Sequence, residues 1–332
     1  MPRGNCCAQH STCFIVPAKF LRKHGDIETA LLSERMRGHR GALRHLGRAS
    51  AGLATGEKRR TIYDTGHTTR LPGKLARGEG SAPTPDLTVN AAYDSAGDTY
   101  DFYLKVLERN SIDGGGMRLD STVHYGADFN NAFWNGQQMV YGDGDGKLFL
   151  GFANAIDVVA HELTHGVTDF TVQGGLNYEG ESGALNESVS DVFGILVKQW
   201  KLNQDVKQSD WLIGAGIMGA QYGKALRSMK EPGTAWTGDD QPGDMGGYVP
   251  GGDVHTNSGI PNHAFFLAAT EIGGFAWQKT GKIWYRALRM LHSDATFEEA
   301  ARVTVDAAAA LFGNGSSEQT AVKNAWKTVK VL

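Results

Sequence analysis

The run from Asp157 to His165, Asp-Val-Val-Ala-His-Glu-Leu-Thr-His, constrains the fold more than any other feature of the chain. His161 and His165 are four residues apart, so a helix would present both imidazoles on one face. Each imidazole can offer a nitrogen to one zinc ion, and Glu162, about 100° further around the helix, can approach an open coordination position. Because only three positions are fixed, the run alone fits a chance match on a core helix equally well.

A second predicted helix adds metal-binding chemistry. Its residues Glu187 and Asp191 are four apart and share a face. A catalytic zinc takes three protein ligands, and two histidines with one glutamate are an established set, so Glu187 can be the third ligand. Asp191 can accept a hydrogen bond from the other ring nitrogen of His161. The alternative, a solvated acidic face, is disfavoured because the helix also has an apolar face, formed by Leu185, Val189, Phe193 and Leu196.

Outside these helices the chain divides into two regions. Residues 58–150 are rich in Gly, Asn, Asp, Thr and Tyr, and we expect mainly strands there, with β-favouring runs at 121–125 and 138–141 and a helix near 97–109. Helical periodicity then recurs at 155–170, 183–200, 261–272, 281–291 and 297–312. Thr296, three residues before Glu299, predicts the N-terminus of the last helix.

Charge sets the N-terminus apart. Residues 1–60 hold 12 Lys and Arg and 4 Asp and Glu, a net charge of +8. Because the whole chain has a net charge of −3, the remaining residues carry −11. The basic segment is either a nucleic-acid arm or a piece that docks on its own acidic body, and the acidity of the body favours docking. The nearly neutral total argues against a dedicated nucleic-acid binder. No apolar run approaches the ~20 residues of a membrane helix.

The three cysteines, Cys6, Cys7 and Cys13, all lie in the first thirteen residues, so the body is expected to fold without a disulfide. The apolar stretch at 14–16 is much shorter than the ~7–15 residues of a signal-peptide core. Classical export is therefore not expected, and a cytoplasmic location and export by another route, with action outside the cell, both stay open. Small residues at 49–56 predict a flexible linker that a protease could cut.

From about residue 85 to its end, the chain resembles the thermolysin family of zinc metalloproteases. The matching blocks, in order, are 130–134, 140–146, the two helices above, 226–229 and the loop around His255. The short N-terminal segment, with Pro-Ala-Lys-Phe-Leu at 17–21, resembles the protealysin-like branch, in which about fifty residues form an inhibitory propeptide. The resemblance implies a two-lobed α+β fold: a propeptide over 1–50, a β-rich lobe over 51–157, and a helical lobe over 158–332, with the zinc helix at the floor of the cleft.

The resemblance also implies roles for single residues. His161, His165 and Glu187 would bind zinc, and Glu162 would take a proton from the attacking water and pass it to the leaving amine. His255 and Tyr178 would donate hydrogen bonds to the oxyanion. By itself, a lone loop histidine is more often structural or exposed, so this role of His255 depends on the resemblance.

Substrate contacts follow from the same resemblance. Asn131 and the carbonyl of Ala132 would hold the substrate backbone, and Arg227 would hold a substrate carbonyl through its forked donors. A bulky apolar residue after the scissile bond is the expected preference, because the pocket for it would be lined by Phe149, Phe152, Val158, Ile217 and Leu226.

Two departures from the family pattern affect the expectations. An aspartate that often orients the catalytic histidine falls at Pro250, so Asp253 or Asp244 would have to replace it, or the His255 tautomer is less fixed. Many members bind paired calcium beside the Glu187 helix. Here Lys198 and Ala215 replace carboxylates while Asp157 and Asp210 are kept, and we expect the Lys198 ammonium to replace the calcium charge and to pair with Asp157. A calcium loop at 143–146 is disfavoured against a simple turn.

The chain is thus expected to be a zinc endopeptidase made as a zymogen. It would act on proteins or peptides, with its own N-terminal segment as inhibitor and with no nucleic-acid or membrane partner. That segment would block the cleft without a sulphur ligand, although one of Cys6, Cys7 or Cys13 capping the zinc stays an alternative. The competing function is a non-enzymatic binding protein with a structural zinc, but such a protein would be expected to lose Glu162, Tyr178, Arg227 or His255. A zinc hydrolase for non-peptide substrates stays open, and no charged wall indicates an exopeptidase.

Overall fold

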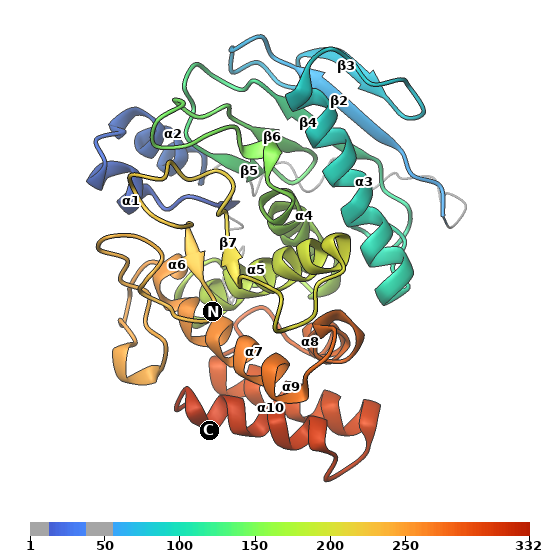
Figure 1. Ribbon diagram of the computed structural model, residues 1–332, viewed down its shortest axis with the longest axis vertical. Coiled ribbons are helices and arrows are strands. Elements are labelled where there is room, and N and C mark those ends of the chain that lie inside the picture. Colours follow the sequence, from blue (N-terminus) through green and yellow to red (C-terminus); the bar gives the residue numbers. More distant parts are fainter. Residues whose placement is uncertain (1–12, 38–55) are drawn as a thin grey trace, which may run out of the picture.

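A mixed sheet and a bundle of helices lie on opposite sides of the long helix α4 (Ile156–Thr171) in the computed structural model, which describes residues 13–37 and 56–332 (Figure 1). The sheet and helix α3 form one lobe, and helices α5 to α10 form the other. One main apolar core runs through both lobes and includes residues of α4 itself. The fold is therefore the expected α+β arrangement, with the histidine-bearing helix between the lobes.

Six strands form the main sheet, in the order β1-β5-β6-β4-β2-β3. Parallel pairing joins β4 to β2 and to β6, and the other neighbours are antiparallel. Both expected β-favouring runs form strands, although β4 ends at Val123 because His124 takes a left-handed conformation with φ 55°. The strands are β1 (Cys13–Phe14), β2 (Arg60–Asp64), β3 (Lys74–Gly78), β4 (Leu119–Val123), β5 (Ala132–Trp134) and β6 (Met139–Tyr141).

The five helices expected after residue 153 are all present, and Thr296 caps α9 by accepting a hydrogen bond from the Glu299 amide, as predicted. Helix α3 begins ten residues before its expected start, because Asp86 accepts from the amides of Thr88 and Val89. Helix α10, capped by Ser316, was not expected. Beyond α4, the long helices are α3 (Leu87–Leu107), α5 (Gly180–Leu202), α7 (Gly259–Ile272), α8 (Thr280–Leu288), α9 (Phe297–Phe312) and α10 (Ser317–Thr328).

Helix α5 crosses α4 at very short range, and Gly194 permits this approach. A methyl group at Gly194 would lie 2.7 Å from the carbonyl oxygen of Asp157 and 3.5 Å from Cβ of His161. Any larger residue would push the two helices apart. The close crossing places the acidic residues of α5 directly against the histidines of α4.

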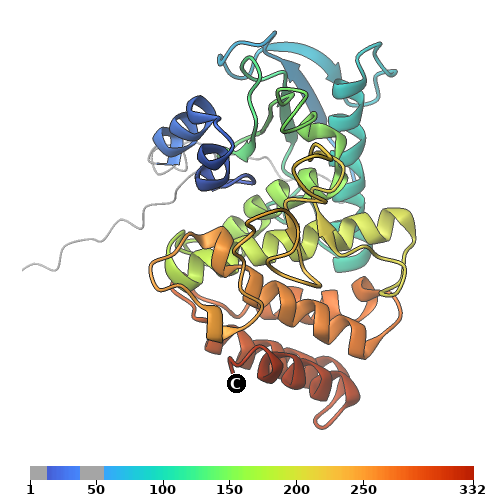
Figure 2. The same cartoon turned by 60° about the vertical axis from the view of Figure 1, so that its left-hand side comes forward.

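The N-terminal segment forms strand β1 and helices α1 (Ala18–Lys23) and α2 (Ile27–Arg37). Figure 2 shows these helices on one side of the molecule, between the sheet lobe and the helical lobe. Phe14 packs in a small buried cluster with Tyr125, Phe129, Phe133 and Val140. The expected linker at 49–56 and the boundary near residue 50 lie almost entirely outside the described residues.

None of the helices in the described part of the chain combines the length and apolar character that crossing a membrane requires.

His124 joins three elements of the sheet lobe. Its Nε2 lies 2.8 Å from Asp86, the cap of α3, and its Nδ1 lies 2.8 Å from Asp143, which follows β6. The hydrogen bond to Asp143 and then that to Asp86 outweigh the effect of burial and raise the pKa of His124 to about 9. The ion pairs therefore favour the folded state only while the imidazole is charged.

We expect replacement of His124 by Gln to destabilise the chain in a pH-dependent way. A histidine whose pKa is raised by folding contributes all of its stabilisation below the unfolded pKa of 6.5 and loses it as the pH rises through about 9. The difference in free energy of unfolding between parent and His124→Gln should therefore shrink across this interval. Urea unfolding in a Glu162→Gln background measures it, with the exposed His292→Gln as control. A difference that stays constant with pH would contradict the assignment.

Candidate active site

Three side chains from α4 and α5 converge at the centre of the molecule. The Nε2 atoms of His161 and His165 are 3.1 Å apart. The carboxylate of Glu187 lies 3.4 Å from Nε2 of His161 and 3.5 Å from Nε2 of His165. All three side chains are fully buried. Two nitrogens and a carboxylate therefore point at one spot.

The donors at this spot fit a zinc ion. Glu187 Oε2 accepts no hydrogen bond from the described residues, although a buried carboxylate oxygen ordinarily has a partner. Burial lowers the pKa of His161, but Asp191 and Glu187 outweigh it and raise that pKa to about 9, so the spot favours positive charge. Two imidazoles with one carboxylate are also a ligand set that catalytic zinc uses.

Both imidazoles are held from behind, so that each presents Nε2. His161 Nδ1 lies 2.8 Å from Asp191 Oδ1. His165 Nδ1 lies 2.8 Å from Asn186 Oδ1 and 3.0 Å from Ser190 Oγ. The partner role of Asp191 was expected from the sequence, whereas those of Asn186 and Ser190 were not. The signal for them was available, because 186 and 190 are four apart and directly precede the two assigned acids.

Asp191 is a shared anchor as well as a partner of His161. The Nε and Nη2 atoms of Arg227 donate to its two oxygens at 2.7 and 2.8 Å, and Asn262 Nδ2 donates at 2.8 Å. Burial acts against ionisation of Asp191, but Arg227 and then His161 outweigh it and hold its pKa well below the usual range. The carboxylate therefore stays ionised and fixes Arg227 in the cleft.

Glu162 lies beside this group on α4 and is itself buried. One of its oxygens accepts a hydrogen bond from the Trp134 amide of β5 at 3.0 Å. This contact ties the carboxylate of Glu162 on α4 to strand β5 of the main sheet.

Tyr178 and His255 approach from the helical lobe. The Tyr178 hydroxyl donates to Glu187 and lies 3.4 Å from His255 Nε2. His255 stands on the short helix α6 (Val254–Asn257), which Asp253 caps. The two residues thus place a hydroxyl and an imidazole group against the carboxylate of Glu187.

Asp253 takes the place of the aspartate that is missing at Pro250. Its Oδ1 lies 2.7 Å from His255 Nδ1 and accepts from the His255 amide at 2.9 Å. Asp244, the other candidate, instead caps a short turn and pairs with Lys330 at 2.9 Å. One residue therefore both starts the helix and orients the ring.

The expected substrate-binding groups contact the N-terminal segment of the same chain. Asn131 accepts from the Val16 amide and donates to the Val16 carbonyl, both at 3.0 Å, and the Ala132 carbonyl accepts from the Ile15 amide at 3.3 Å. On the other side, Arg227 Nη1 donates to the Ile15 carbonyl at 2.9 Å. The carbonyl oxygen of Phe14 lies 2.7 Å from His255 Nε2.

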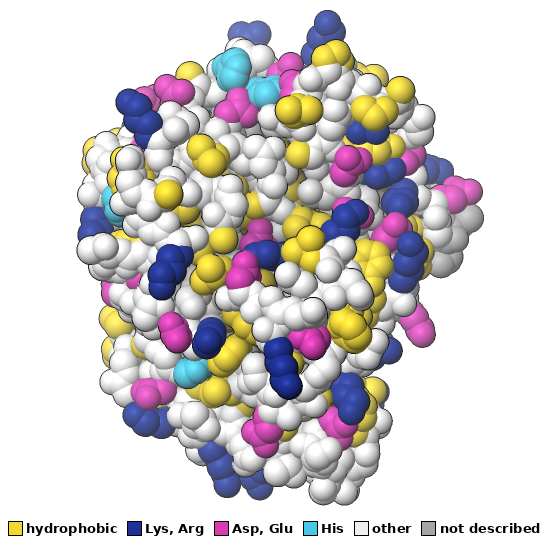
Figure 3. Space-filling model, viewed as in Figure 1, with side chains coloured by type: hydrophobic (Ala, Val, Ile, Leu, Met, Phe, Trp, Pro, Cys, Tyr) yellow, Lys and Arg dark blue, Asp and Glu magenta, His cyan; other side chains and the backbone are white. Residues whose placement is uncertain are grey.

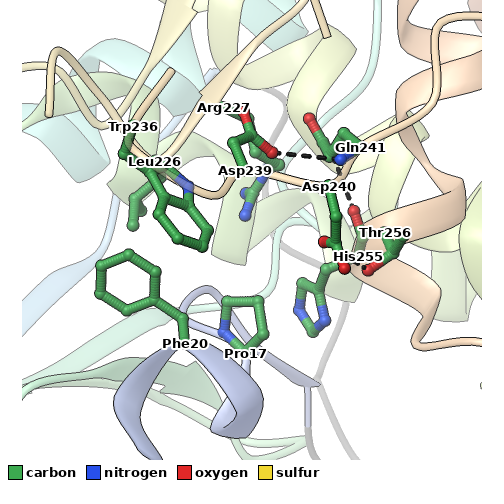
Figure 4. A pocket seen from close by; sticks show the side chains of 10 residues that line it. All are labelled: Pro17, Phe20, Leu226, Arg227, Trp236, Asp239, Asp240, Gln241, His255 and Thr256. Carbon is green, nitrogen blue, oxygen red and sulfur yellow. Dashed lines mark hydrogen bonds between the residues drawn. The ribbon is translucent and has the colours of Figure 1, made fainter. Parts of the chain in front are cut away.

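The five expected pocket residues are buried in the main core together with Ile15 and Phe20. A small cavity near them is lined by Pro17 and Phe20 of the segment and by Leu226, Arg227 and Trp236 of the body (Figure 4). Of the five expected residues, only Leu226 lines this cavity. The ring of Trp236 contacts that of Phe20 edge-on, with 4.7 Å between the ring centroids. This contact was not expected, because a lone aromatic residue in a glycine-rich loop does not indicate a binding site.

Contacts of the basic N-terminal segment with the body are mostly not ionic in the described residues. Lys19 pairs with Asp240, and Lys23 donates to the carbonyls of Thr237 and Gly238 at 3.2 and 3.4 Å, while Arg22 pairs with Glu34 inside the segment. On the face in Figure 3, acidic and basic side chains are interspersed. We expected opposite charges to hold the N-terminal segment on the body. In the described residues, backbone hydrogen bonds and apolar packing make most of these contacts instead.

Lys198 is the residue that we expect to replace the charge of the paired calcium ions. Its ammonium is 2.9 Å from Asp210, 3.5 Å from Asp157 and 3.1 Å from the Leu212 carbonyl. Burial lowers the pKa of Lys198, but Asp157 and then Asp210 outweigh it and raise the pKa. The expected pair with Asp157 is present, with Asp210 as the closer partner.

Comparison with known proteins agrees with this geometry. Residues 52–169 match the family described as thermolysin metallopeptidase, catalytic domain, and residues 174–331 match its alpha-helical domain. The chain is 50% identical over 291 residues to an extracellular metalloprotease of Pectobacterium carotovorum subsp. carotovorum, covering 84% of this chain and 83% of that protein. It is 45% identical over 288 residues to protease PrtS of Photorhabdus sp. (strain Az29), covering 82% and 76%.

A solved structure is also similar over nearly the whole chain. The precursor of protealysin, a metalloproteinase from Serratia proteamaculans, aligns with a TM-score of 0.86 at 45% identity. The alignment covers 96% of this chain and all of that one.

We expect Asp191→Asn to weaken zinc binding by roughly 10- to 100-fold, because loss of the charged partner lowers the basicity of His161 and frees its ring. Competition titration of the full chain against a zinc indicator measures this affinity. Asp253→Asn, which alters a carboxylate that contacts none of the three proposed ligands, serves as the control. Equal affinities of the parent and Asp191→Asn would contradict this role.

Proposed function

The chain belongs to the thermolysin family of zinc metallopeptidases, and on this premise we propose how its residues carry out and restrain peptide-bond hydrolysis. It is a zinc metalloendopeptidase with a β-rich and a helical lobe. We infer that His161, His165 and Glu187 hold the zinc. When bound, zinc lowers the pKa of water to about 7 and polarises a carbonyl group.

Glu162 is the proton carrier in this proposal. It is buried beside the zinc-binding group and held by the Trp134 amide, so its position is fixed before substrate arrives. Glu162 accepts a proton from the attacking water and passes it to the departing amine. Fixed placement of such a group removes the cost of orienting it during the reaction.

His255 and Tyr178 stabilise the negative oxygen that develops during attack. The placement of Phe14 supports this role, since a carbonyl oxygen in the cleft lies 2.7 Å from His255 Nε2, with the Tyr178 hydroxyl 3.4 Å from the same nitrogen. Asp253 positions the ring through Nδ1, which leaves Nε2 for the substrate. Removal of one such donor typically costs about 10²–10³ in kcat.

The path of the N-terminal segment carries the proposal that the enzyme cuts within chains. Strand β1 (Cys13–Phe14) pairs antiparallel with β5, the Ile15 amide adds one hydrogen bond to the Ala132 carbonyl, and the chain then continues into α1. His255 contacts Phe14, and Arg227 and Asn131 contact Ile15 and Val16. A site that accommodates chain on both sides of its centre suits an endopeptidase better than an exopeptidase.

The same contacts support an inhibitory propeptide. The segment uses the backbone contacts proposed for a substrate, and Phe20 with Pro17 closes the adjacent cavity (Figure 4). We propose that residues 1–50 are removed to release activity. Ile15 packs among the apolar residues of the expected pocket, which supports a preference for a bulky apolar residue after the scissile bond.

A purely binding function on this fold is disfavoured, because Glu162, Tyr178, Arg227 and His255 are all present and gathered at one centre. We propose action outside the cell, since the relative from Pectobacterium is described as extracellular.

The decisive test is cleavage of a quenched peptide with Phe or Leu after the scissile bond. We expect activity only in the protein trimmed within 49–56, loss of that activity with a zinc chelator, and a loss of at least about 10²-fold in Glu162→Ala. The exposed Glu179→Ala should remain active. If trimmed, zinc-loaded protein were as inactive as Glu162→Ala, the proposal would be wrong.

We further propose that Lys198 replaces the calcium ions that the family usually binds near α5. A divalent cation would be repelled by an ammonium that already neutralises Asp157 and Asp210. The positive charge is thus supplied by the chain itself.

Millimolar calcium is expected to leave the melting temperature of the parent unchanged. Lys198→Glu should melt several degrees lower, because three carboxylates then face one another, and calcium should restore most of the loss by binding their oxygens. Lys201→Glu, at an exposed position on the same helix, controls for the change of charge. Tight calcium binding by the parent that is lost on Asp157→Ala would contradict the proposal.

A further inference from the structure

We propose that Cys13 is a fourth zinc ligand in the unprocessed chain and that its sulphur keeps the enzyme latent. The inference rests on the proposed function, because it assumes that His161, His165 and Glu187 hold the metal. A sulphur ligand was the less favoured of the two modes of inhibition expected from the sequence.

The position of Cys13 carries this inference. Its Sγ, a nitrogen of His165 and a carboxylate oxygen of Glu187 all lie within 4.8 Å of one another, and all three residues are buried. Cys13 pairs with Trp134 in the β1–β5 ladder, which fixes its backbone in the cleft. The sulphur is therefore held at the metal site by the fold, not by a chance rotamer of an exposed side chain.

Strand geometry explains why the sulphur points inward. Successive side chains of a strand face opposite sides. Phe14 packs outward in the cluster with Tyr125 and Phe133, whereas Ile15 belongs to the main core. Cys13 precedes Phe14 in β1, so its side chain faces the opposite side of the strand, in agreement with its Sγ near His165 of α4.

Glu187 provides a second, independent indication of a ligand at the same spot. Its Oε2 is fully buried and accepts no hydrogen bond from the described residues, with nitrogens of His255 and His161 at 3.3 and 3.4 Å. A cation at this point would satisfy that oxygen, and zinc accepts sulphur as readily as nitrogen or oxygen. The cluster holds one nitrogen, one oxygen and one sulphur, and His161, whose Nε2 lies 3.1 Å from that of His165, would supply the second nitrogen of a four-coordinate set.

This assignment explains how a substrate-like segment can remain uncut. The Phe14 carbonyl contacts His255, and the Ile15 carbonyl contacts Arg227, so the Phe14–Ile15 peptide is held as a substrate would be. A catalytic zinc needs its fourth position open. When the thiol of Cys13 binds there and releases its proton to solvent, that position is filled and no water is available for attack.

Cobalt substitution tests the proposal without relying on activity. The full chain carries Glu162→Gln to prevent self-cleavage, and the thiolate-to-cobalt charge-transfer band in the near ultraviolet reports a sulphur ligand. We expect the band in the parent and in the control Cys6→Ser/Cys7→Ser, and its loss in Cys13→Ser with one cobalt still bound. A band that persists in Cys13→Ser, or that is absent from the cobalt-loaded parent, overturns the sulphur ligand but leaves the metal site intact.

X-ray absorption of the zinc-loaded parent gives an answer that does not depend on whether Cys13→Ser folds. One sulphur neighbour at about 2.3 Å is the expected result. A shell of nitrogen and oxygen alone overturns the sulphur ligand. Failure of every variant, including the trimmed protein, to bind any metal would overturn both this inference and the proposed zinc site.

Discussion

The buried carboxylate of Asp191 is the point on which the rest of the structure depends. It orients His161, fixes Arg227 and accepts from Asn262 of α7, so one group links the proposed metal ligand, the proposed peptide-binding residue and the helical lobe. A buried charge is tolerated only with close partners, and removal of one partner from such a pair typically costs about 3–5 kcal/mol. The close crossing of α4 and α5 at Gly194 brings these partners within reach. The same buried contacts of Asp191 therefore stabilise the fold and fix the positions of His161 and Arg227.

Arg227 extends this linkage to the N-terminal segment. Two of its donors bind Asp191, and a third binds the carbonyl of Ile15. The guanidinium is therefore oriented whether or not the segment is docked, and a substrate finds the donor already in place. A side chain that is already fixed before binding loses little conformational entropy when the ligand binds, which favours association. Under the proposed function, the N-terminal segment and a substrate would compete for this one guanidinium.

Local patterns allowed much of the fold and site to be predicted. Spacing of four residues identified the pairs on α4 and α5, and the apolar period located every long helix after residue 153 except α10, whose sequence has few apolar residues. Contacts between distant segments could not be predicted this way. The Phe14 carbonyl and His255 are 241 residues apart, and no local rule connects them. The choice of Asp253 over Asp244 likewise depends on the turn that starts α6, and the place of Cys13 depends on its register with β5.

The end strand of the main sheet belongs to the segment that is proposed to be removed. After its loss, β5 becomes the border of the sheet, with unpaired amides and carbonyls in a stretch of only three residues, Ala132–Trp134. Open borders of this kind tend to recruit other chains and to cause aggregation, and short length is one way in which proteins limit the risk. The mature enzyme would thus expose a short edge strand that can pair with one extended peptide at a time. This pairing would use backbone amides and carbonyls, which every peptide has. Until then, β1 of the same chain keeps the amides and carbonyls of β5 paired.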